Sequence, residues 1–75
     1  MDVENLIRMA NRIGEFFEAW PDREEARAGI ANHLQKFWPP IMRKDLYAQF
    51  DRDGAPELKS IVAEAIRLHR AEISH

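Results

Sequence analysis

The first third of the chain carries apolar and polar residues with the period of an amphipathic α-helix. At about 100° per residue, all the large apolar residues from Val3 to Trp20 fall on one half of a helical cylinder. This helix should end at Ala19 or Trp20, because Pro21 disfavours a helical conformation in the preceding residue. A helix that packs on one core needs an apolar stripe only slightly wider than about 100°. The wider stripe predicts contacts on two sides, supplied either by neighbouring helices of a four-helix fold or by a partner.

A second helix is predicted to begin after Asp22. The Asp22 side chain can accept a hydrogen bond from a backbone N–H group, and Glu25 follows three residues later, as in a capping box. The helix should end before Pro39 and Pro40, since proline lacks an amide donor and clashes with the preceding turn. Arg27 falls on the apolar side of this helix. Its guanidinium is expected to reach a carboxylate on this chain or on a partner.

Two further helices are predicted to begin at proline residues, which suit the first helical position. Pro40 opens a short third helix, and residues 51–54 are expected to form the turn that follows it. Pro56 opens the fourth helix, which extends to Ile73 with a continuous apolar face. No stretch of alternating apolar and polar residues is long enough for a strand. The predicted fold is therefore all-α, a small bundle of four helices joined by short Pro/Gly turns in one domain over residues 1–75.

Two glycines interrupt the predicted helices at positions 14 and 29. A glycine inside a helix costs about 1 kcal/mol relative to alanine. We therefore expect Gly14 and Gly29 at places where two helices approach each other closely.

Size and composition narrow the classes of function. A chain of 75 residues buries only about 60% of the surface that its unfolded form exposes, so its core gives limited stability. It contains no cysteine, which excludes disulfides, thiolate zinc sites, cysteine-ligated iron–sulfur clusters and a cysteine nucleophile. A partner protein is the expected source of further stability. The net charge of −2 disfavours nucleic-acid binding. Because no apolar run fits a signal peptide or a membrane span, a cytoplasmic protein is expected.

The titratable residues do not form a recognisable catalytic or metal-binding motif. His69 lies on the apolar face of the last helix, where a histidine at the edge of the core with one hydrogen bond is expected rather than an acid–base catalyst. Asp51, Asp53 and Glu57 lie close in sequence, but a calcium-binding loop needs about twelve residues with ligands at alternating positions. A turn and a helix cap explain these carboxylates better. The chain is therefore expected to be non-catalytic, with no catalytic, cofactor-binding or metal-binding residue.

The stretch from Phe37 to Arg43 has the most unusual composition. Its sequence, FWPPIMR, places two aromatic residues, two prolines, a methionine and an arginine at a predicted corner between helices. Aromatic residues and arginine are enriched at the centres of protein interfaces, and proline reduces the entropy lost on docking. Phe37 is expected to close the end of the helix bundle, whereas Trp38 and Arg43 are expected to face a partner.

Two segments resemble the delta subunit of bacterial NAD-dependent formate dehydrogenases. They are residues 6–17, LIRMANRIGEFF, and residues 30–43, IANHLQKFWPPIMR. The shared patterns are RMANxIGxFF and HLxxFWxPxMR, which together cover about the first two thirds of the chain. Pro39 departs from the pattern, since a polar or acidic residue is expected there in relatives. This proline should stiffen the corner without abolishing it.

The resemblance implies a role that composition alone does not give. In that family a large alpha subunit carries a molybdenum or tungsten bis-molybdopterin guanine dinucleotide centre and iron–sulfur clusters. Beta and gamma subunits carry FMN, further clusters and the NAD reaction. The delta subunit has no redox group assigned to it, so this chain is expected to bind no cofactor. The motif residues expected to contact the alpha subunit are Asn11, His33, Trp38, Pro40, Met42 and Arg43.

Three functions remain open from the sequence. The first is an accessory subunit that docks on the alpha subunit and stabilises the assembled enzyme. The second is a transient assembly factor for the molybdenum cofactor, which would need a basic pocket built from Arg8, Arg12, Arg43 and Lys44. Those charges are better explained by a solvated face that neighbouring glutamates balance. The third, a helix-turn-helix DNA-binding protein, is disfavoured by the acidic charge balance and the proline that opens the third helix.

Overall fold

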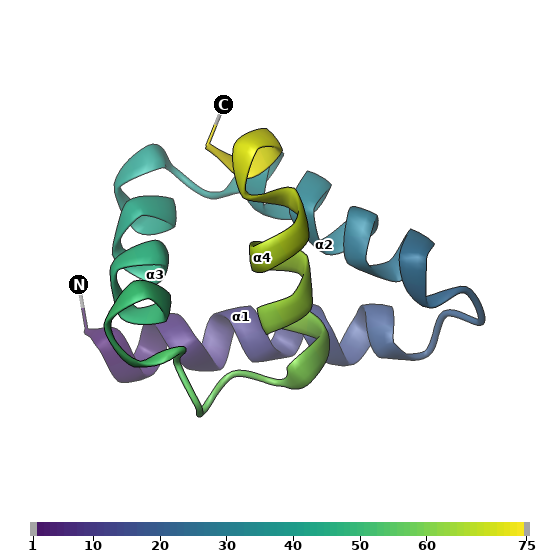
Figure 1. Cartoon of the computed structure of the whole chain (residues 1–75), viewed down its shortest axis with the longest axis horizontal. Coiled ribbons are helices and arrows are strands. Elements are labelled where there is room, and N and C mark those ends of the chain that lie inside the picture. Colours follow the sequence, from purple (N-terminus) through teal and green to yellow (C-terminus); the bar gives the residue numbers. More distant parts are fainter. Residues whose placement is uncertain (1, 75) are drawn as a thin grey trace.

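The computed structural model describes residues 2–74 and folds them into four α-helices with no strand. The helices are α1 (Val3–Glu18), α2 (Arg23–Phe37), α3 (Pro40–Asp53) and α4 (Ser60–Ile73) (Figure 1). The predicted all-α bundle of four helices is confirmed. None of these helices is both long enough and apolar enough to cross a membrane.

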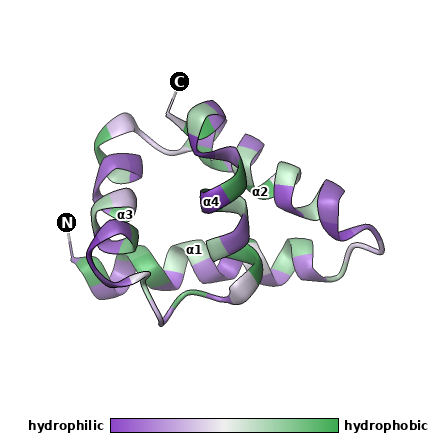
Figure 2. Ribbon diagram, in the orientation of Figure 1, coloured by the Kyte–Doolittle hydropathy of each residue, from purple (hydrophilic) through white to green (hydrophobic). Residues whose placement is uncertain are grey.

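The helices pack around one shared core. Helices α1 and α2 diverge from the turn that joins them, and α3 and α4 lie across α1 (Figure 1). Helices α2 and α4 make the largest contact, and α1 contacts all three of the others. Apolar and polar segments recur along each helix (Figure 2), and each helix contributes buried residues to the core. The largest fully buried side chains are Leu6, Ile30, Leu34, Leu46, Ile61, Val62, Ile66 and Ile73.

Local sequence signals explain both ends of α2 and the start of α3. Asp22 Oδ1 accepts hydrogen bonds from the N–H groups of Glu24 and Glu25, at 2.9 and 3.3 Å, so α2 begins where predicted. The helix ends at Phe37, ahead of the two prolines, and Pro40 occupies the start of α3. Helix α1 likewise ends within one residue of its predicted end.

Two predicted boundaries near the end of α3 are wrong. Residues 51–53 continue α3 instead of forming a turn, and the helix stops at Gly54. The φ angle of Gly54 is +77°, the left-handed conformation with which glycine commonly ends a helix. Pro56 does not open α4, which begins four residues later at Ser60. The intervening segment forms a turn in which the N–H group of Leu58 donates to the carbonyl of Ala55, at 2.9 Å.

The Asn11 side chain explains why α4 starts late. Its amide nitrogen donates to the carbonyl oxygen of Glu57 at 3.0 Å, and its amide oxygen accepts from the N–H group of Lys59 at 2.8 Å. Both bonds hold the segment before Ser60 against α1 in a non-helical conformation. A contact between residues more than forty positions apart therefore overrides the local helix-start signal of Pro56.

The two helical glycines lie where helices approach closely, as predicted. A Cβ atom at Gly14 would stand 2.6 Å from Cγ2 of Val62 on α4. A Cβ atom at Gly29 would stand 2.4 Å from Cε1 of Phe17 on α1. Both separations are far below van der Waals contact, so each close approach requires glycine.

Ion pairs join α4 to α2 and to α3. Glu64 on α4 accepts hydrogen bonds from Arg23 and Arg27 on α2, each at a closest distance of 2.9 Å. These bonds lower the pKa of Glu64 to about 2. Arg70 on α4 donates to both carboxylate oxygens of Asp51 on α3, at 2.6 and 2.7 Å. Arg27 thus finds the carboxylate expected from its position, and that carboxylate belongs to this chain.

Candidate interaction surface

Large apolar side chains lie exposed along one side of α1 and α2. Phe16 is 66% exposed and Phe37 is 70% exposed. Between them lies His33, whose ring centroid is 4.8 Å from that of Phe37. Phe16 and His33 also line a shallow hollow of about 450 Å³. Arg12, Ile13 and Phe17 line the rest of this hollow. We call the surface formed by Phe16, His33, Phe37 and the hollow the aromatic face.

Buried neighbours hold the α1 part of the aromatic face in place. The Phe16 ring meets the ring of buried Phe17 edge-on, with centroids 5.0 Å apart and an interplanar angle of 89°. Trp20, which is 40% exposed, extends the surface, with its ring centroid 6.5 Å from that of Phe16. The wide apolar stripe of α1 is therefore covered by other helices on the Phe17 side and uncovered on the Phe16 side. Contiguous exposed apolar surface of this kind is typical of a protein interaction site.

Phe37 and Trp38, the two aromatic residues at the corner, lie in the opposite environments to those expected from the sequence. Trp38 is only 6% exposed and belongs to the core, whereas the largely exposed Phe37 does not close the bundle. Helical spacing explains the exchange, because Trp38 continues the buried row of Ile30 and Leu34 at intervals of four residues. Phe37 instead lies one turn after His33, on the side of α2 that no other helix covers.

The six predicted contact residues do not form one surface. Trp38 and Arg43 are buried, and Met42 packs against the core. The Asn11 side chain is bound to the segment before α4, as described above. His33 lies within the aromatic face, and Pro40 is exposed at the start of α3.

Sequence reasoning missed the exposure of Phe16, Phe37 and Ile41, the last of which is 69% exposed. One signal was available for Phe16, because the apolar stripe of α1 is wider than a single core requires. No comparable signal marked Phe37, which lies next to the buried Trp38 in the same aromatic pair.

The basic residues considered for a cofactor pocket lie in two different places. Arg8 and Arg12 line a hollow together with acidic side chains of α1 and of the segment before α4. Arg43 and Lys44 line a separate pocket between α3 and α4. The structure therefore does not gather these four cations into one basic site.

Two of the three carboxylates considered for chemistry, and the histidine, have structural partners; the third carboxylate, Glu57, is exposed. Asp51 pairs with Arg70, and Asp53 Oδ1 accepts the N–H group of Ala55 at 2.9 Å. His69 is partly buried at the edge of the core, and its Nδ1 lies 2.9 Å from Glu72 Oε2, as expected of a histidine with one hydrogen bond. Residues 2–74 contain no cluster of three or more acidic, histidine or cysteine side chains that could hold a metal ion. These residues do not fit the molybdenum or iron–sulfur groups of a formate dehydrogenase.

Fold and surface together define the class of this chain, a small helical domain with an apolar face that its own helices leave uncovered. The chain belongs to the family of NADH-dependant formate dehydrogenase delta subunits, FdsD, whose family model matches residues 5–66. This match confirms the resemblance drawn from the two sequence motifs. Membership implies a delta subunit of a formate dehydrogenase, and hence partner subunits. No curated protein and no solved structure gave a significant match to the chain.

Proposed function

We propose that this chain is a non-catalytic subunit that docks through its aromatic face on the catalytic alpha subunit of a cytoplasmic NAD-dependent formate dehydrogenase. In the assembled enzyme it would stabilise the alpha subunit by binding its folded form. The observation that carries this proposal is the exposure of Phe16 and Phe37 on either side of His33. Family membership supports the assignment to a formate dehydrogenase complex.

The energetics of the aromatic face favour a stable contact. Burying one large apolar side chain contributes about 1.5–3 kcal/mol, and about 1.4 kcal/mol changes a dissociation constant tenfold. Burial of Phe16 and Phe37 together would therefore contribute about 3–6 kcal/mol towards the free energy that docking requires. The close approach of Gly29 to Phe17 fixes α1 against α2. The two helices that carry the aromatic face are therefore already held together, so little backbone conformational entropy is lost on docking.

In this proposal the redox groups belong to the partners. The alpha subunit carries the bis-molybdopterin guanine dinucleotide centre with molybdenum or tungsten, together with iron–sulfur clusters. Beta and gamma subunits carry FMN, further clusters and the reaction with NAD. This chain, which has no cysteine, contributes surface only.

Substitution of the exposed aromatic side chains tests the proposal. The double variant Phe16→Ser with Phe37→Ser is expected to lose co-purification with the alpha subunit while keeping the circular dichroism spectrum of the unaltered chain. Leu68→Ser is the matched control, because Leu68 is 57% exposed on α4 and lies outside the aromatic face. Undiminished co-purification of the double variant would contradict docking through this face.

Stoichiometry tests the alternative of a transient assembly factor. A permanent subunit is retained in the mature, metal-loaded enzyme at a fixed ratio to the alpha subunit. An assembly factor is instead found only with immature enzyme. Loss of this chain from the mature complex would therefore contradict the subunit role.

A further inference from the structure

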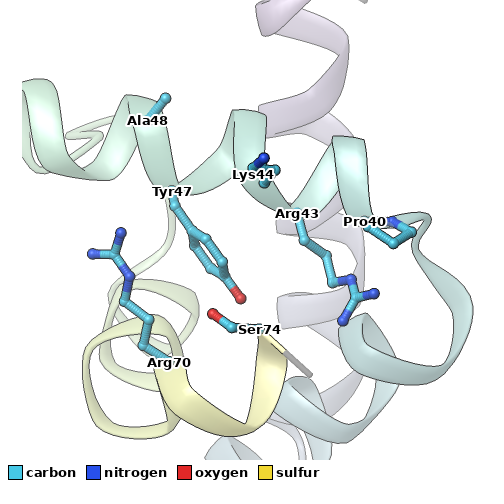
Figure 3. A pocket seen from close by; sticks show the side chains of 7 residues that line it. All are labelled: Pro40, Arg43, Lys44, Tyr47, Ala48, Arg70 and Ser74. Carbon is cyan, nitrogen blue, oxygen red and sulfur yellow. The ribbon is translucent and has the colours of Figure 1, made fainter.

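A pocket of about 410 Å³ lies between α3 and the C-terminal end of α4. Figure 3 shows the Tyr47 ring standing between the side chains of Arg43 and Arg70, with its hydroxyl group next to Ser74. Pro40, Ala48 and the Tyr47 ring give the pocket apolar walls, and Lys44 is exposed beside it. The aromatic face does not share any residue with this pocket.

Two buried polar groups in this pocket have no hydrogen-bond partner of normal geometry among residues 2–74, although the Tyr47 hydroxyl lies next to Ser74. Arg43 is 7% exposed and donates from Nη1 to the carbonyl oxygen of Ile73, but its Nε is buried without an acceptor. Tyr47 is also 7% exposed, and its hydroxyl group has no partner of normal hydrogen-bond geometry. Burial raises the pKa of this hydroxyl, so it stays protonated and can donate. Buried donors are costly when unpaired, and a buried charge is costlier still.

The charges around the pocket leave an excess of positive charge. Arg70 is neutralised by its two hydrogen bonds to Asp51. Arg43 has only a neutral carbonyl as partner among residues 2–74, and Lys44 makes no ion pair with these residues. The inner end of the pocket therefore offers one guanidinium and one hydroxyl donor, with an ammonium group nearby.

We propose that the α3–α4 pocket binds a carboxylate group, which in the assembled enzyme is an acidic side chain of the subunit on which this chain docks. Charge-assisted hydrogen bonds from a guanidinium to a carboxylate are stronger than bonds between neutral groups. The buried Nε of Arg43 and the hydroxyl of Tyr47 are donors for such a group. The claim that a partner subunit supplies the carboxylate rests on the proposed function. The claim that the pocket prefers a carboxylate rests on the pocket alone.

The pocket fits a carboxylate better than a phosphate. A phosphate carries up to two charges and three strong acceptor oxygens at neutral pH, whereas the pocket has two buried donors without a partner, Arg43 Nε and the Tyr47 hydroxyl, which match the two oxygens of a carboxylate. The apolar walls also suit the methylene groups of an aspartate or glutamate side chain. An acidic residue docked in this pocket would give the subunit contact a polar anchor apart from the aromatic face.

Titration of the isolated chain with N-acetylglutamate, followed by NMR, tests the preference for a carboxylate. The Nε–H resonance of Arg43 and the ring resonances of Tyr47 are expected to shift together and to saturate. Inorganic phosphate at the same concentration should produce a smaller shift. Absence of saturation, or a stronger response to phosphate, would overturn the proposal. Movement of the Arg43 Nε–H resonance through the acid range in which carboxyl groups titrate, with no added carboxylate, would show that an acid group of this chain fills the pocket, and would also overturn it.

Variants assign the response to the pocket. Tyr47→Phe keeps the shape of the side chain and should weaken binding about fivefold, the effect expected of one hydrogen bond. Lys44→Gln should weaken binding about twofold, and Lys36→Gln, an exposed lysine on α2, is the matched control with no effect. Arg43→Gln, which keeps a donor for the Ile73 carbonyl, should abolish the response of the Tyr47 ring. Equal effects of Lys44→Gln and Lys36→Gln would contradict the site.

Measurements on the assembled enzyme distinguish failure of this proposal from failure of the proposed function. Tyr47→Phe combined with Lys44→Gln should speed dissociation of the chain from the assembled enzyme by about tenfold, the product of the two separate factors. An unchanged rate, with carboxylate binding intact in the isolated chain, would overturn the partner side chain as the source. If the aromatic-face variants instead left docking unchanged, that result would count against the proposed function. The titration of the isolated chain would still test whether the pocket binds a carboxylate.

Discussion

One side of helix α2 packs against α4, whereas the other side carries the aromatic face. On the α4 side, Ile30 and Leu34 are fully buried, and Arg23 and Arg27 bind Glu64 at the edge of the contact. On the other side, Phe37 is exposed and its ring lies beside that of His33. The two sides show that helical periodicity sets where apolar residues lie, but the packing of the whole chain decides which of them are covered.

Truncating a side chain on each side of α2 should show the largest difference. Leu34→Ala is expected to lower the free energy of unfolding of the isolated chain by about 2–5 kcal/mol, because Leu34 is fully buried. Phe37→Ala should change it by less than about 0.5 kcal/mol, since its ring is mostly in solvent. Urea denaturation measures both. A similar loss for the two variants would contradict the difference in burial.

Adding a methyl group between helices should have the next largest effect. Gly14→Ala gains about 1 kcal/mol in helix propensity, but its Cβ atom would meet the stiff, fully buried Val62 at 2.6 Å. Overpacking of this kind costs about 1–3 kcal/mol, so the variant is expected to melt at a lower temperature than the unaltered chain. Ala28→Gly, at an exposed position of α2, gives the propensity effect alone. A raised melting temperature for Gly14→Ala would show that α1 and α4 are not in close contact.

The ion pairs on the α4 side of α2 should give a smaller, pH-dependent effect. Arg23 and Arg27 lower the pKa of Glu64 from 4.5 to about 2, so the folded state binds this proton less readily than the unfolded state. The stabilisation is present above pH 4.5 and is lost as pH falls towards 2. Denaturation at a series of pH values should therefore show a shallower acid decline for Glu64→Gln than for the unaltered chain. Identical declines would mean that the ion pairs contribute nothing to stability.

Much of the fold could be predicted because its signals are local. Asp22 and the pair Pro39 and Pro40 act on neighbouring residues, so the boundaries of α2 followed from the sequence. The start of α4 could not be predicted in the same way, since Asn11 on α1 holds the segment after Pro56 in a non-helical turn. That contact depends on how α1 and α4 approach each other.

The candidate surface was only partly predictable for a related reason. The sequence marks an aromatic pair at the corner, but Phe37 and Trp38 differ by one position, and one helical step turns a side chain by about 100°. Which of the two is buried depends on where α4 packs against α2. The exposed part of the α1 stripe was foreseeable from its width, whereas the pocket beside Arg43 arises only when α3 meets the end of α4.

Hydroxyl-radical footprinting of the isolated chain and of the assembled formate dehydrogenase tests the central claim most directly. If the aromatic face is the docking surface, Phe16 and Phe37 will be oxidised several times more slowly in the complex, while buried Trp38 and exposed Leu68 will react at unchanged rates. Equal oxidation of Phe16 and Phe37 in the two samples would contradict docking through this face.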